Sequence, residues 1–208
     1  MLAAYVPNGH SLERRDIVSG EEVPDNAVWL DLVNPAPGED KLIERLLGIA
    51  VPTREEMQEI EVSSRLYVEN HARYMTATLM CNSDTATPKT TAVTFILSGH
   101  RLVTVRYDAP KPFMLVENKL ARGTAPGANG ETVLLELLDA VIDRCADILE
   151  RAGADVDAVS HAIFEPEGAA RTGHAKRYSD RCKSPAHETT PASAPGLRID
   201  LRFVESAS

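Results

Sequence analysis

Residues 133–163, VLLELLDAVIDRCADILERAGADVDAVSHAI, repeat apolar side chains in steps that alternate between three and four residues. A mean spacing of about 3.5 residues is typical of a helix that packs along another helix. At about 1.5 Å per residue such a helix would exceed about 45 Å, so we expect it to project from a compact head. The alternative is a globular helix that packs flat on a core. We call the apolar positions the seam: they are 135, 138, 142, 145, 149, 152, 156, 159 and 163.

Carboxylates occupy the face of this helix opposite the seam, at Asp139, Asp143, Asp147 and Glu150. Carboxylate oxygens are the ligands that hard cations such as Mg²⁺ prefer. We therefore take Asp139 and Asp143 as candidate metal ligands. The alternative is a solvated acidic face, because nothing in the pattern fixes an octahedral arrangement.

Short helices and strands alternate irregularly before the long helix. Apolar alternation and β-branched residues predict strands at 28–33, 73–80, 90–97 and 101–107, the last two joined by a turn at Ser98-Gly99-His100. Helical periodicity and capping residues predict helices at 38–48, from Thr53 onward, and at 111–123. The predicted fold class is α/β: a mixed-sheet α/β/α sandwich followed by a long protruding helix.

Three regions follow from this pattern. Residues 1–128 form the α/β domain, and residues 129–180 form the long helix region. Residues 181–208 contain Pro185, Pro191 and Pro195, which interrupt helices because proline lacks a backbone N–H and clashes with the preceding turn. We expect this last region to be an aberrant, disordered tail.

Composition excludes several classes of function. The net charge of −9 argues against a nucleic-acid partner, since phosphate backbones require a concentrated basic surface. No stretch approaches the roughly 20 apolar residues that cross a bilayer, so this chain alone is expected to be cytoplasmic. No nucleophile motif or phosphate-binding loop is present, and we expect no enzymatic activity.

The order of four segments resembles the cytoplasmic region of the CorA-type magnesium and cobalt transporter family over residues 1–178. The segments are VWLDLVNP (28–35), VPTREEMQEIEVSSRLYVENHARYMTATLM (51–80), TTAVTFILSGHRLVTVRY (90–107) and LLELLDAVIDRCADILERAGADVDAVSHAIFE (134–165). The resemblance implies a homopentameric, channel-like transporter of Mg²⁺, often also passing Co²⁺ or Ni²⁺. It also implies a place on the cytoplasmic face of the cell inner membrane.

The same resemblance implies regulatory Mg²⁺ sites between subunits, built from carboxylates that include one on the short helix after a loop. The corresponding stretch is TREEMQEIE, residues 53–61, in which Glu56 and Glu59 are the nearest candidates. The alternative roles are a capping residue and a solvated helix face.

The sequence departs from the family pattern at its C-terminal end. The Gly-Met-Asn pore signature and the two apolar helices of the family do not occur in it. We interpret the chain as a transporter domain truncated before its pore, which would reach the membrane only through the missing part. The alternative is a soluble cation-binding or oligomerisation remnant without transport activity.

Overall fold

The computed structural model describes residues 1–18, 20–58, 65–123 and 128–164. The predicted tail at 181–208 lies outside these residues. The strands are β1 (Leu2–Asn8), β2 (Ser11–Ile17), β3 (Trp29–Val33), β4 (Leu66–Glu69), β5 (Ala72–Cys81), β6 (Lys89–Ser98) and β7 (Arg101–Arg106). The helices are α1 (Glu39–Leu47), α2 (Arg54–Met57), α3 (Lys111–Ala121) and α4 (Gly130–Phe164).

A seven-stranded sheet, in the order β2-β1-β3-β7-β6-β5-β4, organises the head. Only the central pair β3 and β7 is parallel, and the other neighbours run antiparallel. The sheet is therefore mixed, as the sequence predicted. Strand β7 follows β6 through a two-residue turn in which Gly99 has a φ of 57°, a left-handed conformation that glycine adopts without steric cost.

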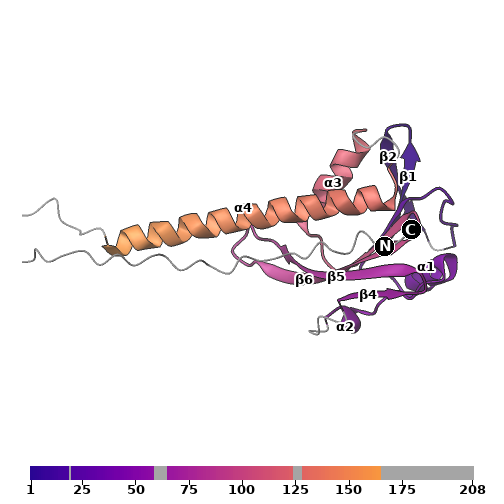
Figure 1. The fold of residues 1–208 in the computed structure, drawn as a ribbon, viewed down its shortest axis with the longest axis horizontal. Helices are drawn as coiled ribbons and strands as arrows, with labels where there is room; N and C mark the ends of the chain where they lie inside the picture. Colours follow the sequence, from indigo (N-terminus) through magenta and orange to yellow (C-terminus); the bar gives the residue numbers. More distant parts are fainter. Residues whose placement is uncertain (19, 59–64, 124–127, 165–208) are drawn as a thin grey trace, which may run out of the picture. The chain divides into compact units, whose positions relative to one another are not determined.

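Helices cover both faces of this sheet (Figure 1). Phe113 of α3 and Leu137 of α4 belong to one apolar cluster, which includes Trp29. Ile43 of α1 and Met57 of α2 belong to a second cluster on the other face. The predicted α/β/α sandwich is confirmed, and burial of these two apolar layers is the main stabilising contribution to the head.

A buried polar network crosses the parallel pair of strands. The indole N–H of Trp29 donates to Thr104 Oγ1 at 2.9 Å, and the Thr104 hydroxyl donates to Asp31 Oδ1 at 2.6 Å. Arg106 Nη2 donates to Asp31 Oδ2 at 2.8 Å, and its guanidinium lies 4.5 Å from the centroid of the Phe113 ring. Because each buried polar group has a partner, the network fixes the β3–β7 register without an unpaired charge.

Sequence patterns located most elements but missed three strands. β1, β2 and β4 were not predicted. The β1–β2 hairpin turns at Gly9, whose φ is 62°, and an Asn-Gly pair such as Asn8-Gly9 is a strong hairpin signal. β4 has four residues, of which three are exposed, and so short a strand carries little periodicity.

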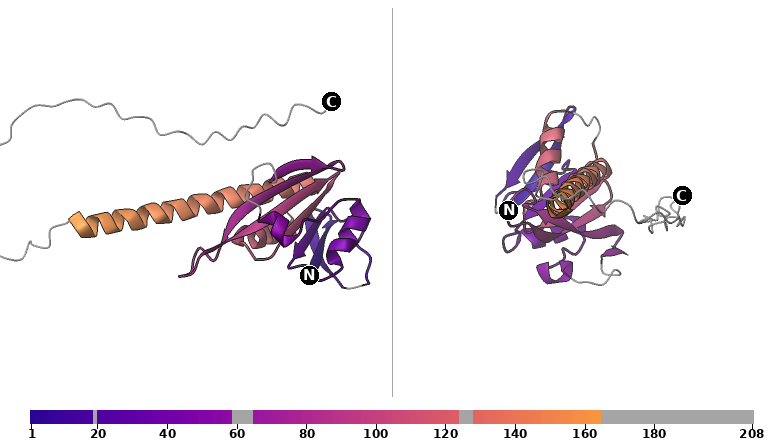
Figure 2. Two further views of the ribbon diagram at one scale, coloured as in Figure 1. Left: turned by 90° about the horizontal axis from the view of Figure 1, so that it is seen from below. Right: turned by 90° about the vertical axis from the view of Figure 1, so that its left-hand side faces the viewer.

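Helix α4 runs unbroken for 35 residues, through Gly153, to Phe164. Its first half packs on the sheet, and Arg144 is its last buried residue. From residue 145 to residue 164 every side chain except that of Ile148 is exposed. This half extends beyond the sheet (Figure 2), so the prediction of a long projecting helix is confirmed. Within the described residues, no helix has the length and apolar content that would cross a membrane.

Candidate cation site and the projecting helix

The seam of α4 faces away from the head. Leu135 is 62% exposed, Leu149 is 71% exposed and Ile163 is 68% exposed. The head instead contacts a separate stripe of the helix that includes Val133 and Leu137, both fully buried. The alternative of a globular helix that packs flat on a core holds only for the first half of α4, and there it is not the seam that packs on the core. A run of exposed apolar side chains along one helix face is typical of a surface that binds another helix.

The acidic face of α4 borders a groove against α3. The groove has a volume of about 400 Å³, and Asp139, Asp143 and Asp147 lie along it together with Lys111 and Lys119 of α3. Asp139 and Asp143 are both exposed. The structure thus places these two predicted ligands together, one helical turn apart, at the edge of a concave surface.

Basic side chains share this groove with the aspartates. Lys119 forms an ion pair with Glu136, and Arg144 Nη1 lies 3.8 Å from Asp147 Oδ2. Among the described residues no group of three or more His, Cys, Asp or Glu side chains is arranged to hold a metal ion. Within the part of the chain that the structure describes, Asp139 and Asp143 therefore do not form a full coordination sphere for Mg²⁺, which takes six oxygen ligands in near-octahedral geometry.

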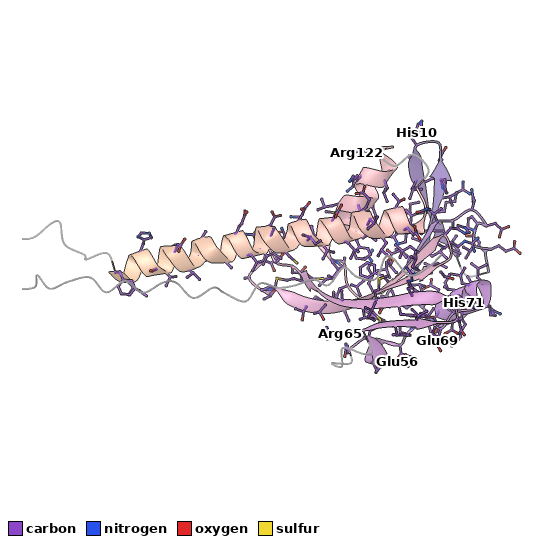
Figure 3. The ribbon with its side chains drawn as sticks, in the orientation of Figure 1. His10, Glu56, Arg65, Glu69, His71 and Arg122 are labelled. Carbon is purple, nitrogen blue, oxygen red and sulfur yellow. The ribbon has the colours of Figure 1, made fainter. Side chains whose placement is uncertain are left out.

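Glu56 lies elsewhere and has another role. Its carboxylate accepts a hydrogen bond from the backbone N–H of Thr53 at 2.8 Å, while the Glu56 N–H donates to Thr53 Oγ1 at 3.3 Å. This is the capping box that starts α2. Helix α2 and Glu56 lie on the side of the sheet away from α4 (Figure 3), so one chain does not bring Glu56 to Asp139 and Asp143. Glu59, the other candidate of this stretch, lies outside the described residues.

Asp84, which sequence patterns did not single out, joins the β5–β6 connection to both helices of this face. Its Oδ1 accepts from Arg144 Nη2 at 2.7 Å and from Arg151 Nη1 at 2.9 Å, and its Oδ2 accepts from Lys111 Nζ at 3.0 Å. Hydrogen bonds from these three cations hold the pKa of the Asp84 carboxyl well below its usual range. We call this group of four residues the Asp84 clasp. It fixes α4 to the head where the helix leaves the sheet.

The sequence of residues 24–189 matches the protein family described as "CorA-like Mg2+ transporter protein". The chain is similar to the magnesium transport protein CorA of Wolinella succinogenes, with 27% identity over 143 residues that cover 67% of this chain and 44% of the relative. It is also similar to CorA of Escherichia coli strain K12, with 26% identity over 165 residues that cover 79% of this chain and 52% of the relative. The chain spans about half the length of these curated relatives.

Solved structures share its fold. The complete CorA magnesium transporter of Methanocaldococcus jannaschii aligns with a TM-score of 0.61 and 13% identity, over 81% of this chain and 53% of that one. The soluble domain of the same transporter aligns with a TM-score of 0.58 and 17% identity, over 81% of this chain and 66% of that one. The ZntB cytoplasmic domain of Vibrio parahaemolyticus aligns with a TM-score of 0.51 and 14% identity, over 72% of this chain and 62% of that one.

Proposed function

The chain belongs to the CorA-like Mg²⁺ transporter protein family, and from this premise we propose that it serves as the cytoplasmic α/β domain of a divalent-cation transporter. The proposed cargo is Mg²⁺, with Co²⁺ and Ni²⁺ as further candidates. The observation that carries the proposal is the family match over residues 24–189, together with a fold that the soluble domain of a CorA transporter shares. In this role the domain carries out no covalent chemistry.

Self-association is the second part of the proposal, with a homopentamer as the expected assembly. The exposed seam of α4 supports it, because Leu149, Val156 and Ile163 are each more than half exposed on one helix face. Apolar side chains at a 3.5-residue spacing are stabilised when a second helix covers them. Sedimentation velocity of the full chain should detect this assembly. A Val156→Asp variant should shift it toward monomer, whereas Asp157→Asn, a change at the neighbouring exposed position, should not.

Regulatory cation binding is the third part of the proposal. Asp139 and Asp143 would supply two oxygen ligands, and the rest would come from water and from oxygen atoms of a neighbouring copy. Two exposed carboxylates one turn apart repel each other when no cation lies between them, and this repulsion supports the assignment. Binding of Mg²⁺ would remove the repulsion and so favour the folded, assembled chain.

Thermal unfolding of the full chain in rising MgCl₂ tests the cation proposal. A ligand that binds only the folded state stabilises it by about 2.7 kcal/mol at a hundred times its Kd. The double variant Asp139→Asn/Asp143→Asn should lose the Mg²⁺-dependent rise in Tm, while Asp157→Asn should keep it. An equal rise in all three proteins would show that Mg²⁺ acts elsewhere, and no rise in the parent chain would contradict a site on this domain.

A further inference from the structure

A polar cavity lies between α2 and the sheet, on the face opposite α4. Its volume is about 280 Å³, and it is lined by residues of α2, β5 and β6, by the segment that follows β7, and by Arg65, which directly precedes β4. Its polar lining includes Arg54, Arg65, Thr78, Thr90, Tyr107 and Asp108. None of these residues belongs to the groove that holds Asp139 and Asp143.

Positive charge is in excess around this cavity, although the chain as a whole carries a net charge of −9. Among the described residues of the lining, Asp108 is the one acidic residue, and Lys89 Nζ lies 2.5 Å from its Oδ1. Neither Arg54 nor Arg65 forms an ion pair with a carboxylate of the described residues. Among the described residues, the carboxylate of Asp108 is thus paired with Lys89, and neither guanidinium lies within ion-pair distance of a carboxylate.

Both arginines retain donors for an anion. The Arg54 guanidinium lies 5.1 Å from the centroid of the Tyr107 ring, and stacking on a ring leaves the N–H groups at the guanidinium edge available. Arg65 Nη1 makes a long hydrogen bond of 3.4 Å to Thr78 Oγ1, and its Nε is buried without an acceptor. A buried donor without an acceptor loses its hydrogen bonds to water without replacing them, and an oxyanion at this position would restore a hydrogen bond to the Arg65 Nε–H.

We propose that this cavity binds a phosphate group, with Arg54 and Arg65 as the charged ligands and hydroxyls of Thr78 and Thr90 as further donors. Guanidinium groups bind phosphate oxygens through paired, charge-assisted hydrogen bonds. The volume is slightly below the range of about 300–1,000 Å³ found for sites that enclose drug-sized ligands. It therefore suits a phosphate group better than an entire nucleotide. This site is independent of the transport proposal and of the candidate Mg²⁺ site.

Two sources share this chemistry: free inorganic phosphate and the terminal phosphates of a nucleotide. Isothermal titration of the full chain with sodium phosphate, with ATP and with adenosine, all without Mg²⁺ and at constant ionic strength set with NaCl, separates them. Similar Kd values for phosphate and ATP identify the free anion as the ligand. An ATP Kd at least tenfold lower identifies the nucleotide. In either case adenosine alone should not bind.

The variant Arg65→Gln should weaken phosphate or ATP binding at least tenfold. Arg54→Gln tests the second ligand in the same way. Arg73→Gln is the matched control, because Arg73 is an exposed arginine of β5 that does not line the cavity. It should bind as the parent does, and each variant is first checked for an unchanged Tm. The proposal is overturned if neither phosphate nor ATP binds the parent chain, or if Arg65→Gln and Arg73→Gln bind equally well.

Discussion

Residues 130–144 of α4 lie against the sheet, whereas residues 145–164 of the same helix extend beyond it and expose nearly every side chain. The first half buries Val133 and Leu137 completely, and the Asp84 clasp holds both sides of the boundary between the halves, through Arg144 and Arg151. The second half continues a helix that is already nucleated, so it avoids the unfavourable first turn. The helical state of the second half is stabilised by the helix propensity of its residues and, in the proposed assembly, by a second helix that covers the seam.

The comparison teaches that one helix can carry two apolar stripes with separate roles. The seam continues through both halves, from Leu135 to Ile163, and is exposed in each. The stripe that contacts the head is confined to the first half and ends near Arg144. A periodic apolar pattern therefore predicts a surface that binds another helix, but it does not predict which helix. In this chain the head does not cover the seam.

The largest expected effect is a difference in stability between two leucine-to-alanine variants, one in each half of α4. Leu137→Ala removes a side chain that is 0% exposed, and we expect it to lower the free energy of unfolding by about 2–5 kcal/mol. Leu149→Ala removes one that is 71% exposed, and in dilute solution we expect a change within about 0.5 kcal/mol. Urea denaturation followed by circular dichroism measures both variants.

Repeating the measurement on both variants at several protein concentrations tests whether the seam joins copies of the chain. If the seam joins copies of the chain, Leu149→Ala should lower stability only at concentrations where the parent associates, because its side chain is buried only there. The cost of Leu137→Ala should not depend on concentration. Equal costs for the two variants in dilute solution would contradict the division of α4 into a packed and an extended half.

A methyl group at Gly130 should have the next largest effect. An added Cβ would clash with the backbone N of Leu102 and would lie 2.5 Å from the backbone C of Arg101. These backbone atoms belong to β7, which is hydrogen-bonded to β3 and β6, so they cannot shift without disturbing the sheet. Gly130→Ala therefore forces the start of α4 away from the sheet. We expect a loss of about 1–3 kcal/mol, measured by urea denaturation. An unchanged midpoint would mean that α4 does not approach β7 this closely.

Asp84→Asn should have a smaller effect that depends on pH. The folded-state pKa of Asp84 is lowered, so its carboxylate stabilises the fold above the unfolded pKa of about 3.9. That stabilisation is lost as pH falls below this value. The variant should therefore melt below the parent at pH 7, and the difference should narrow as pH falls below about 4. Asp157→Asn, at an exposed position of α4, is the control and should show no such convergence.

Local patterns predicted the parts of the fold that depend on neighbours in the sequence. The Thr53–Glu56 capping box and the turn at Gly99 involve residues no more than three positions apart, and both formed as expected. The Asp84 clasp joins residues 27 to 67 positions apart. No spacing rule predicts such a contact, because it depends on how β5, β6 and α4 pack.

The candidate cation site shows the same limit. Asp139 and Asp143 lie one helical turn apart on α4, as their spacing predicts, and their role as cation ligands stays a prediction. Glu56 was predicted separately, through the resemblance, as a ligand of a site between subunits, and its helix packs on the other face of the sheet. Sequence alone could not reveal this separation, since the order of strands in the sheet decides which helices share a face.

The smallest expected effect is a gain of stability in the extended half. An added Cβ at Gly153 would have no atom within 4 Å, so Gly153→Ala introduces no clash, and alanine favours the helix over glycine by about 0.8–1.0 kcal/mol. We expect this half to open locally without unfolding the head, because its side chains are exposed, so the gain should appear as roughly fivefold slower amide hydrogen exchange around residue 153. The global Tm should stay the same. A rise in Tm would instead mean that the extended half unfolds together with the packed half, and that its exposure does not make it an independent unit.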